Sequence, residues 1–167
     1  MRTTVVIGND IEVRPLTDVI NRVFENWSVR HETPPERRDE LEHWFAALAG
    51  DLSIHTALGI GDAAFWAHAI ASRCGCLEIL VDPVPPAAET ESFTGSEVLW
   101  SGCLVLLSGE GEARHQGWVY SEFRHAEIVE SRLGRDELLT HEMPRIRDFL
   151  DQRGATGDYI PEAWAND

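Results

Sequence analysis

The apolar pattern of the chain changes its period near Arg73, and this change limits the architectures that the chain can adopt. Before Arg73, apolar residues recur at every third or fourth position, which is typical of amphipathic helices. After Arg73 they come in short runs between loops rich in glycine and proline, which is typical of strands. Helices followed by a group of strands predict an α+β fold with an antiparallel sheet.

Three helices are predicted in the first half of the chain. The first begins at about Thr17, because residues 19 to 27 carry one apolar stripe. The second follows the capping box Thr33-Pro34-Pro35-Glu36 and ends at Gly50. Asp62 is placed to cap the third. Ahead of them, residues 3–7 and 11–13 flank turn residues and predict a short hairpin.

Four strands are predicted to follow Arg73, over residues 77–81, 97–108, 112–123 and 127–133. Gly109-Glu110-Gly111 predicts a hairpin turn between the two long strands. A last helix is expected over Thr140–Arg153. Both faces of the strand over 97–108 are apolar, so we expect the outer face of the sheet to be covered in a homodimer.

The composition excludes two classes of partner. The chain has 167 residues and a formal net charge of -15, and such an acidic protein repels nucleic acid and anionic membranes. No stretch approaches the roughly 18 apolar residues of a membrane helix, and the start lacks the pattern of a signal peptide. The three cysteines form no disulfide framework. We therefore expect a cytoplasmic protein.

Two stretches resemble a known family. Residues 19–27 followed by 45–55 resemble the opening of the nuclear transport factor 2-like (NTF2-like) superfamily. Phe123-Arg124, Ile128-Val129-Glu130 and the later Asp136 are similar to the closing motif of the SnoaL-like polyketide cyclases. The resemblance implies a cone-shaped, curved antiparallel sheet of the cystatin-like type, covered by the N-terminal helices. It implies one domain over 1–167, with a hairpin extension (1–16), a core (17–140) and a C-terminal helix and tail (141–167).

Three side chains are candidates for acid–base catalysis, because a carboxyl or imidazole group buried in an apolar cone can exchange a proton near neutral pH. The resemblance makes Asp136 the general acid, although Asp136 could equally cap a helix. Glu122 shares one face of a predicted strand with Trp118 and Tyr120, and that face lines either the pocket or solvent. His55 ends a short predicted strand and points inward or outward.

The aromatic residues are candidates for substrate binding, since tryptophan gives flat apolar walls. This set comprises Trp27, Trp66, Trp100, Trp118 and Tyr120. Histidine and cysteine spacing predicts no metal site, and neither GxSxG nor a dinucleotide fingerprint is present. We expect chemistry without a cofactor.

These observations favour a cofactor-independent acid–base enzyme that acts on a small hydrophobic metabolite. Cyclisation, isomerisation, dehydration and epoxide hydrolysis all fit, and natural-product biosynthesis is the expected setting. The alternative is a non-catalytic protein of the same fold, which binds a small molecule or acts as a dimeric accessory protein. A pocket without a polar group on its wall would favour that alternative.

Overall fold

The computed structural model describes residues 2–87, 102–124 and 126–154. In these ranges the strands form one parallel sheet in the order β2-β1-β3-β4-β5-β6. The strands are β1 (Thr3–Ile7), β2 (Ser28–Glu32), β3 (Ile54–Ile60), β4 (Leu77–Val81), β5 (Cys103–Leu107) and β6 (Glu127–Glu130). The strand order reverses direction between β1 and β3. Open parallel sheets bind ligands beyond the carboxyl ends of their strands at such a switch point.

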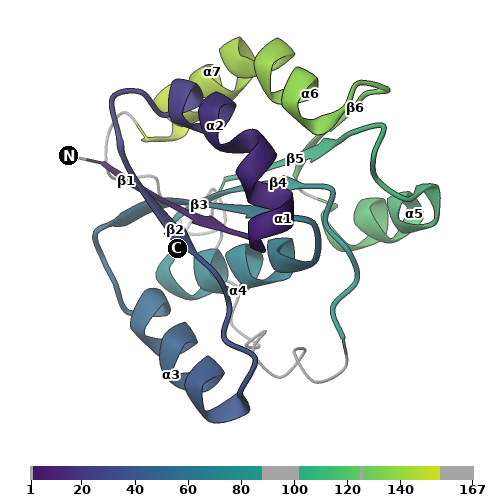
Figure 1. Cartoon of the computed structure of the whole chain (residues 1–167). Helices are drawn as coiled ribbons and strands as arrows, with labels where there is room; N and C mark the ends of the chain where they lie inside the picture. The colour runs from purple at the N-terminus through teal and green to yellow at the C-terminus, as the bar shows by residue number, and fades with distance from the viewer. Residues whose placement is uncertain (1, 88–101, 125, 155–167) are drawn as a thin grey trace, which may run out of the picture.

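Helices cover both faces of the sheet (Figure 1). Helices α2, α6 and α7 lie above the sheet in this view, and α3 and α4 lie below it. The helical elements are α1 (Asp10–Val13), η1 (Arg14–Leu16), α2 (Thr17–Val23), α3 (Arg38–Ala49), η2 (Gly61–Ala63), α4 (Ala64–Cys74), α5 (Ala113–Glu122), α6 (Arg135–His141) and α7 (Met143–Gly154). The result is a three-layer α/β arrangement.

The sheet separates two apolar cores. On β5, Leu104 and Leu106 pack with α2, α6 and α7, whereas Val105 and Leu107 pack with α4 and α5. A strand with helices on both faces is apolar on both faces, because neither face meets water. The apolar pattern that suggested a homodimer is therefore explained within one chain. The homodimer itself stays a prediction.

The prediction of an α+β fold with an antiparallel, cone-shaped sheet is wrong. Each strand pairing of the described sheet is parallel, and helices follow β1, β2, β3 and β5 along the chain. Residues 112–123 form helix α5 instead of a strand, and residues 11–13 belong to α1 instead of a hairpin. The turn at Gly109-Glu110-Gly111 connects a strand to a helix. Since parallel neighbours need long crossovers, the predicted hairpins cannot form here.

Several local predictions are confirmed. Helix α2 begins at Thr17 and buries Val19, Ile20 and Val23, as its apolar stripe indicates, but it ends at Val23, and the end of the predicted helix, near Arg30-His31, lies in strand β2. Helix α3 ends before Gly50, but it begins at Arg38 and makes no use of the predicted capping box. The Thr33 hydroxyl donates to the Gly8 carbonyl oxygen at 3.2 Å instead.

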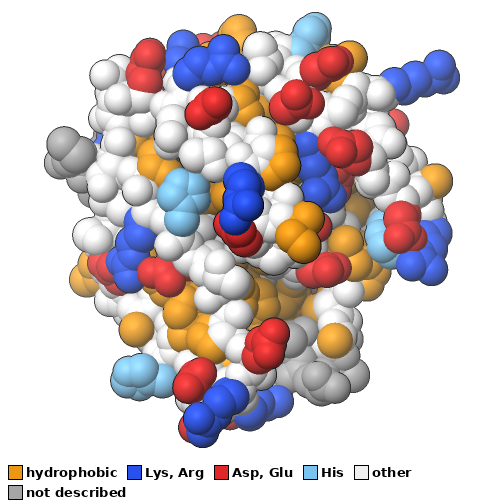
Figure 2. All heavy atoms as spheres, in the orientation of Figure 1, with side chains coloured by type: hydrophobic (Ala, Val, Ile, Leu, Met, Phe, Trp, Pro, Cys, Tyr) orange, Lys and Arg blue, Asp and Glu red, His pale blue; other side chains and the backbone are white. Residues whose placement is uncertain are grey.

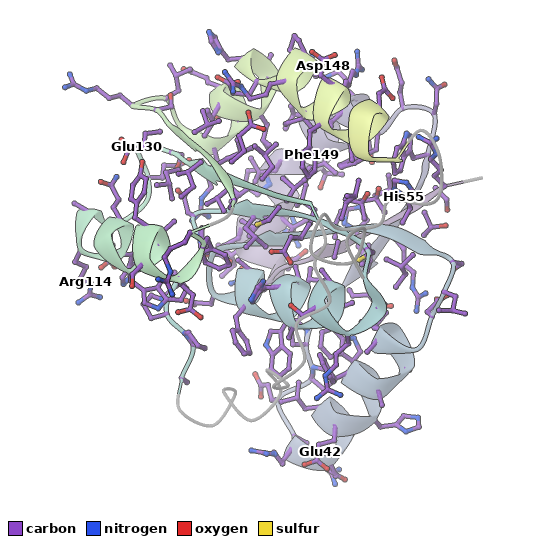
Figure 3. All side chains as sticks on the ribbon, turned by 180° about the vertical axis from the view of Figure 1, so that it is seen from behind. Glu42, His55, Arg114, Glu130, Asp148 and Phe149 are labelled. Atoms are coloured by element: carbon purple, nitrogen blue, oxygen red, sulfur yellow. The ribbon has the colours of Figure 1, made fainter. Side chains whose placement is uncertain are left out.

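Helix α7 packs its apolar side against one face of the sheet. Phe149 of α7 points toward the sheet, whereas the neighbouring Asp148 points away from it (Figure 3). Within the described ranges, no helix is long and apolar enough to span a bilayer.

Candidate functional site

A polar cleft lies beyond the carboxyl ends of the strands, where the strand order reverses. Its volume is about 230 Å³. Its walls come from loops that are far apart in the sequence and from the first turns of α5 and α6. The lining residues include Glu12, Gly61, Asp62, Asp82, Ser108, Glu110, Glu112, His115 and Arg135. The topology thus brings together charged residues that no short motif connects.

The floor of the cleft is the sharp turn between β3 and α4. Gly61 has a φ of 61°, a left-handed conformation that side chains other than glycine rarely adopt. Gly59 lies against α4, since an added Cβ atom would come within 2.6 Å of the Ala64 Cα atom. A Cβ atom at Gly61 would collide with the Glu12 carboxylate. Glu12 therefore fills the space in which a side chain at position 61 would lie.

Arg135 is the centre of an ion-pair network on one wall. Its Nε donates to Asp82 Oδ2 at 2.8 Å, and its Nη1 lies 3.6 Å from Glu12 Oε1. Its backbone N–H donates to Glu110 Oε2 at 2.6 Å. Burial opposes the charge of Arg135, yet hydrogen bonding to Asp82 and the charges of Asp82 and Glu12 raise its pKa.

Asp82 and Ser108 join β4 to β5 beneath this network. Asp82 is 3% exposed, and its carboxylate accepts the Ser108 N–H at 2.7 Å and the Ser108 hydroxyl at 2.5 Å. The Ser108 oxygen in turn accepts the Glu110 N–H at 3.1 Å. Both the donor and the acceptor of this hydroxyl are therefore used by the protein.

The Glu12 carboxylate accepts fewer hydrogen bonds than the Asp82 carboxylate does. Its Oε2 accepts from Asn9 Nδ2 at 3.1 Å. Burial raises the pKa of Glu12, Arg135 opposes this, and the nearby Asp62 raises the pKa further. The cleft therefore has more negative charge than its one guanidinium balances. Among the described residues, no group of three or more histidine, cysteine, aspartate or glutamate side chains could hold a metal ion.

The three predicted catalytic residues lie apart from this cleft. Asp136 is exposed in the first turn of α6, and Gly134 is the N-cap in its place. His55 is half-buried on β3, with its ring 4.8 Å from that of Trp27. It lies on the opposite side of the molecule from α5 (Figure 3). Glu122 is the exposed last residue of α5. Their catalytic roles stay predictions.

The predicted aromatic residues are also dispersed. Trp66 is buried against Trp44, Phe45 and Phe65. On α5, Trp118 and Glu122 are one helical turn apart and line a second pocket, whereas Tyr120 is 47% exposed. Trp100 lies outside the described residues. Of the predicted set, the structure therefore brings together Trp27 with His55, and Trp118 with Glu122.

Comparison with known proteins bears on the fold alone. No family model and no curated protein matches the chain. A solved structure from Xanthomonas campestris pv. campestris, provisionally assigned as a hydrolase of the alpha/beta superfamily, matches with a TM-score of 0.57. The match covers 92% of this chain and 97% of that one, at 12% identity. The chain has an α/β-hydrolase-like fold.

This result overturns the resemblance to the NTF2-like superfamily and to the SnoaL-like cyclases. That resemblance required an antiparallel cone, and the fold is a parallel sheet between two helical layers. An enzyme is compatible with an α/β-hydrolase-like fold, whereas a cyclase of the SnoaL type has no support.

The turn after β3 leads sharply from a strand into a helix, at the kind of place where α/β-hydrolases have their nucleophile elbow. In α/β-hydrolases, the serine of G-x-S-x-G lies on a sharp turn from strand to helix, and an acid and a histidine follow along the chain. Here the corresponding run is Gly59-Ile60-Gly61-Asp62-Ala63, with glycine at the nucleophile position. After β6, the loop of residues 131–134 contains no histidine, and Arg135 follows it.

Sequence reasoning missed every residue of the cleft. One signal was available: small residues at 59, 61 and 63 follow a strand and precede a helix, which is the spacing of an elbow without its serine. Because the stretch has no serine, it does not match GxSxG, and Gly59-Ile60-Gly61 is too short for a dinucleotide fingerprint. The ion-pair network had no such signal, because its members come from separate loops.

Proposed function

We propose that this chain is a non-catalytic binding protein, which holds a small positively charged molecule in its polar cleft. The observation that carries the proposal is the elbow itself. Gly61 supplies no nucleophile, and the Glu12 carboxylate occupies the space that a nucleophile's side chain would need. A backbone that supports covalent catalysis elsewhere is here combined with side chains that cannot perform it.

The remaining hydroxyl of the cleft does not replace the missing serine. Ser108 is 3% exposed, donates to Asp82 and supports the Glu110 N–H. A serine nucleophile needs an adjacent base and access to the substrate carbonyl. His115 lines the cleft, but its Nε2 lies 3.9 Å from the Glu112 carboxylate. Among the described cleft residues, no hydrogen bond therefore joins an accessible hydroxyl to an imidazole base.

The charge of the cleft favours a cation. Its lining includes five carboxylates, namely those of Glu12, Asp62, Asp82, Glu110 and Glu112, against the single guanidinium of Arg135. Clefts lined by one sign of charge focus the field and concentrate ligands of the opposite sign. An amine or guanidinium group beside Glu12 would relieve the repulsion from Asp62 that raises the Glu12 pKa.

Calorimetric titration tests the proposal with agmatine and putrescine as probes, and with glutarate as an anion of similar size. We expect saturable binding of the cations and none of glutarate. Glu12→Gln should weaken cation binding, because it removes a charge from the floor of the cleft. Glu36→Gln is the matched control at an exposed position outside the cleft. Binding of glutarate alone, or equal cation affinity in Glu12→Gln, would overturn the proposal.

A catalytic alternative rests on Glu12. A carboxylate with a raised pKa that lies at the elbow is suited to act as a general base. Turnover of any substrate in this cleft should then fall in Glu12→Gln with little change in substrate affinity. Loss of affinity without an activity to lose supports the binding protein instead.

A further inference from the structure

A second pocket lies on the α4 and α5 side of the sheet. Its volume is about 320 Å³, at the lower end of the range of about 300–1,000 Å³ for small-molecule sites. Pro83 lines both this pocket and the polar cleft, but the charged residues of the two differ. The pocket is lined by Phe65, His68, Pro83, Pro86, Trp118, Glu122 and Phe123. Three aromatic rings and two prolines therefore surround one imidazole.

The imidazole of His68 is fixed by a buried carboxylate. Its Nδ1 lies 2.9 Å and 3.2 Å from the two carboxylate oxygens of Glu78, which is 3% exposed on β4. A carboxylate can only accept here, so Nδ1 carries the proton. In the part of the chain that the structure describes, no hydrogen bond engages the other ring nitrogen, Nε2.

The surroundings of His68 favour the charged form of its imidazole. Burial works against the charged form, but the charge and hydrogen bond of Glu78 outweigh it, and Glu122 on α5 adds to them, so the pKa of His68 is raised. Burial raises the pKa of the neighbouring Cys103 thiol on β5, and the charge of Glu78 and a hydrogen bond to Glu78 raise it further. The imidazole therefore keeps its proton to a higher pH than an ordinary histidine, and when it is protonated its Nε2–H is a charged donor on a residue that lines the pocket.

Aromatic side chains form the apolar part of the pocket around His68. The Phe123 ring lies 5.0 Å from the His68 ring, and the Trp118 ring lies 5.6 Å from that of Phe123, both nearly perpendicular. Such an arrangement presents flat apolar faces, against which an aromatic ring packs well. The ion pair between His68 and Glu78 uses only the Nδ1 atom of the imidazole. Here the ring that carries the second nitrogen belongs to a residue that lines a pocket of ligand size.

We propose that this pocket binds a small aromatic carboxylate, whose oxygens accept from His68 Nε2–H while its ring packs between Trp118 and Phe65. Glu122 lies at the pocket wall and is exposed, so water screens its repulsion of the ligand. The site is separate from the proposed cation cleft and does not depend on it. The residues that line it come from α4, from the loop after β4, and from α5 and the residue that follows it.

The test is calorimetric titration of the full chain with benzoate and indole-3-carboxylate, and with benzamide and benzylamine as neutral and cationic counterparts. We expect the carboxylates to bind, benzamide to bind more weakly and benzylamine not at all. The affinity for benzoate should be higher at pH about 5.5 than at pH about 8.5, because the imidazole loses its proton as the pH rises.

Two variants distinguish the contribution of the His68 imidazole from that of the aromatic residues that line the pocket. His68→Asn keeps an amide donor for Glu78 in place of Nδ1 and removes Nε2, so benzoate affinity should fall about tenfold or more. Trp118→Ala leaves the His68–Glu78 pair intact and should also weaken binding. Glu12→Gln is the control in the other cleft and should bind benzoate as the wild type does.

Three outcomes would overturn the proposal: no saturable binding of either carboxylate, a preference for benzylamine, or wild-type affinity in both His68→Asn and Trp118→Ala. Circular dichroism melting of each variant shows whether it is folded, and Trp118→Ala decides the matter if His68→Asn is not. Because Glu12→Gln affects only the cation cleft, failure of this proposal is distinguishable from failure of the proposed function.

Discussion

Two half-buried cationic side chains of this protein, Arg135 and His68, differ in what surrounds them. Arg135 in the polar cleft contacts Asp82 and Glu12 through its side chain and Glu110 through its backbone. His68 in the aromatic pocket contacts Glu78 through one nitrogen and leaves the other at the pocket wall. A charge whose partners all come from the protein holds loops together, whereas a charge with a free donor is available to a ligand.

The surface gives little guide to this difference. Figure 2 shows acidic and basic side chains intermixed over one face of the molecule. Exposed pairs such as Arg38–Glu42 contribute little to stability, because water and salt screen them. The informative charges are the buried ones, and their contrast leads to the following expectations.

The largest effect is expected for Arg135→Gln. It leaves Asp82, which is 3% exposed, and Glu12 without their cation, and removing one partner of a buried ion pair costs about 3–5 kcal/mol. Urea unfolding followed by circular dichroism measures this loss. Arg132→Gln is the matched control, since Arg132 is exposed in the preceding loop, and its change should stay within about 0.5 kcal/mol. An equal fall in the free energy of unfolding in both variants would show that the ion pairs of Arg135 with Asp82 and Glu12 do not stabilise the fold.

A smaller effect is expected for His68→Ala, which leaves Glu78 buried without its donor. The free energy of unfolding should fall by about 2–3 kcal/mol at a pH of about 6. Because the pKa of His68 is raised, the stabilisation is complete below the ordinary imidazole pKa and is lost as the pH rises through the raised value.

Unfolding experiments across the pH range check this sign. The difference between wild type and His68→Ala should shrink toward alkaline pH. His43→Ala, at an exposed position on α3, serves as control and should show no such trend. A difference that grows with pH would mean that the imidazole is neutral in the folded protein.

The smallest effects compare a glycine beneath the cleft with a glycine on the pocket helix. A Cβ atom at Gly59 would lie 2.6 Å from Ala64 Cα and 2.7 Å from Ala67 Cβ, so Gly59→Ala should destabilise by about 1–3 kcal/mol. Gly117 on α5 has open space around it, so Gly117→Ala should stabilise by about 0.5–1 kcal/mol. Thermal melting of the two variants reports opposite shifts if the packing is as described.

The local elements were more predictable than their assembly. The apolar stripe of residues 19–27 predicted the start and the buried face of α2, because helix period is a local property, but the helix ends at Val23. Residues 112–123 were misread, since Trp118, Val119 and Tyr120 have a high strand propensity. In the structure, Trp118 and Glu122 face the pocket one helical turn apart, and Val119 is buried. The sequence of this segment fits a strand about as well as a helix. In the structure the segment is a helix, and Val119 packs in one apolar core with residues of α4 and β5.

The direction of the strands was the decisive error. A run that is apolar on both faces indicates a parallel strand between helices as well as a covered sheet in a dimer. The sequence pattern of 103–107 could not distinguish these readings, because pairing is a long-range property. For the same reason the cleft could not be foreseen: Glu12, Asp82 and Arg135 meet only when β1, β4 and β6 stand in one sheet.

Covalent labelling tests the central claim most directly, namely that this elbow carries no nucleophile. The full chain is incubated with a fluorophosphonate probe, and its intact mass is measured beside that of a serine hydrolase as a positive control. The account predicts an unchanged mass, since Gly61 offers no side chain and Ser108 is bound to Asp82. A stoichiometric adduct mapped to Ser108, or to any other residue of the cleft, would contradict it.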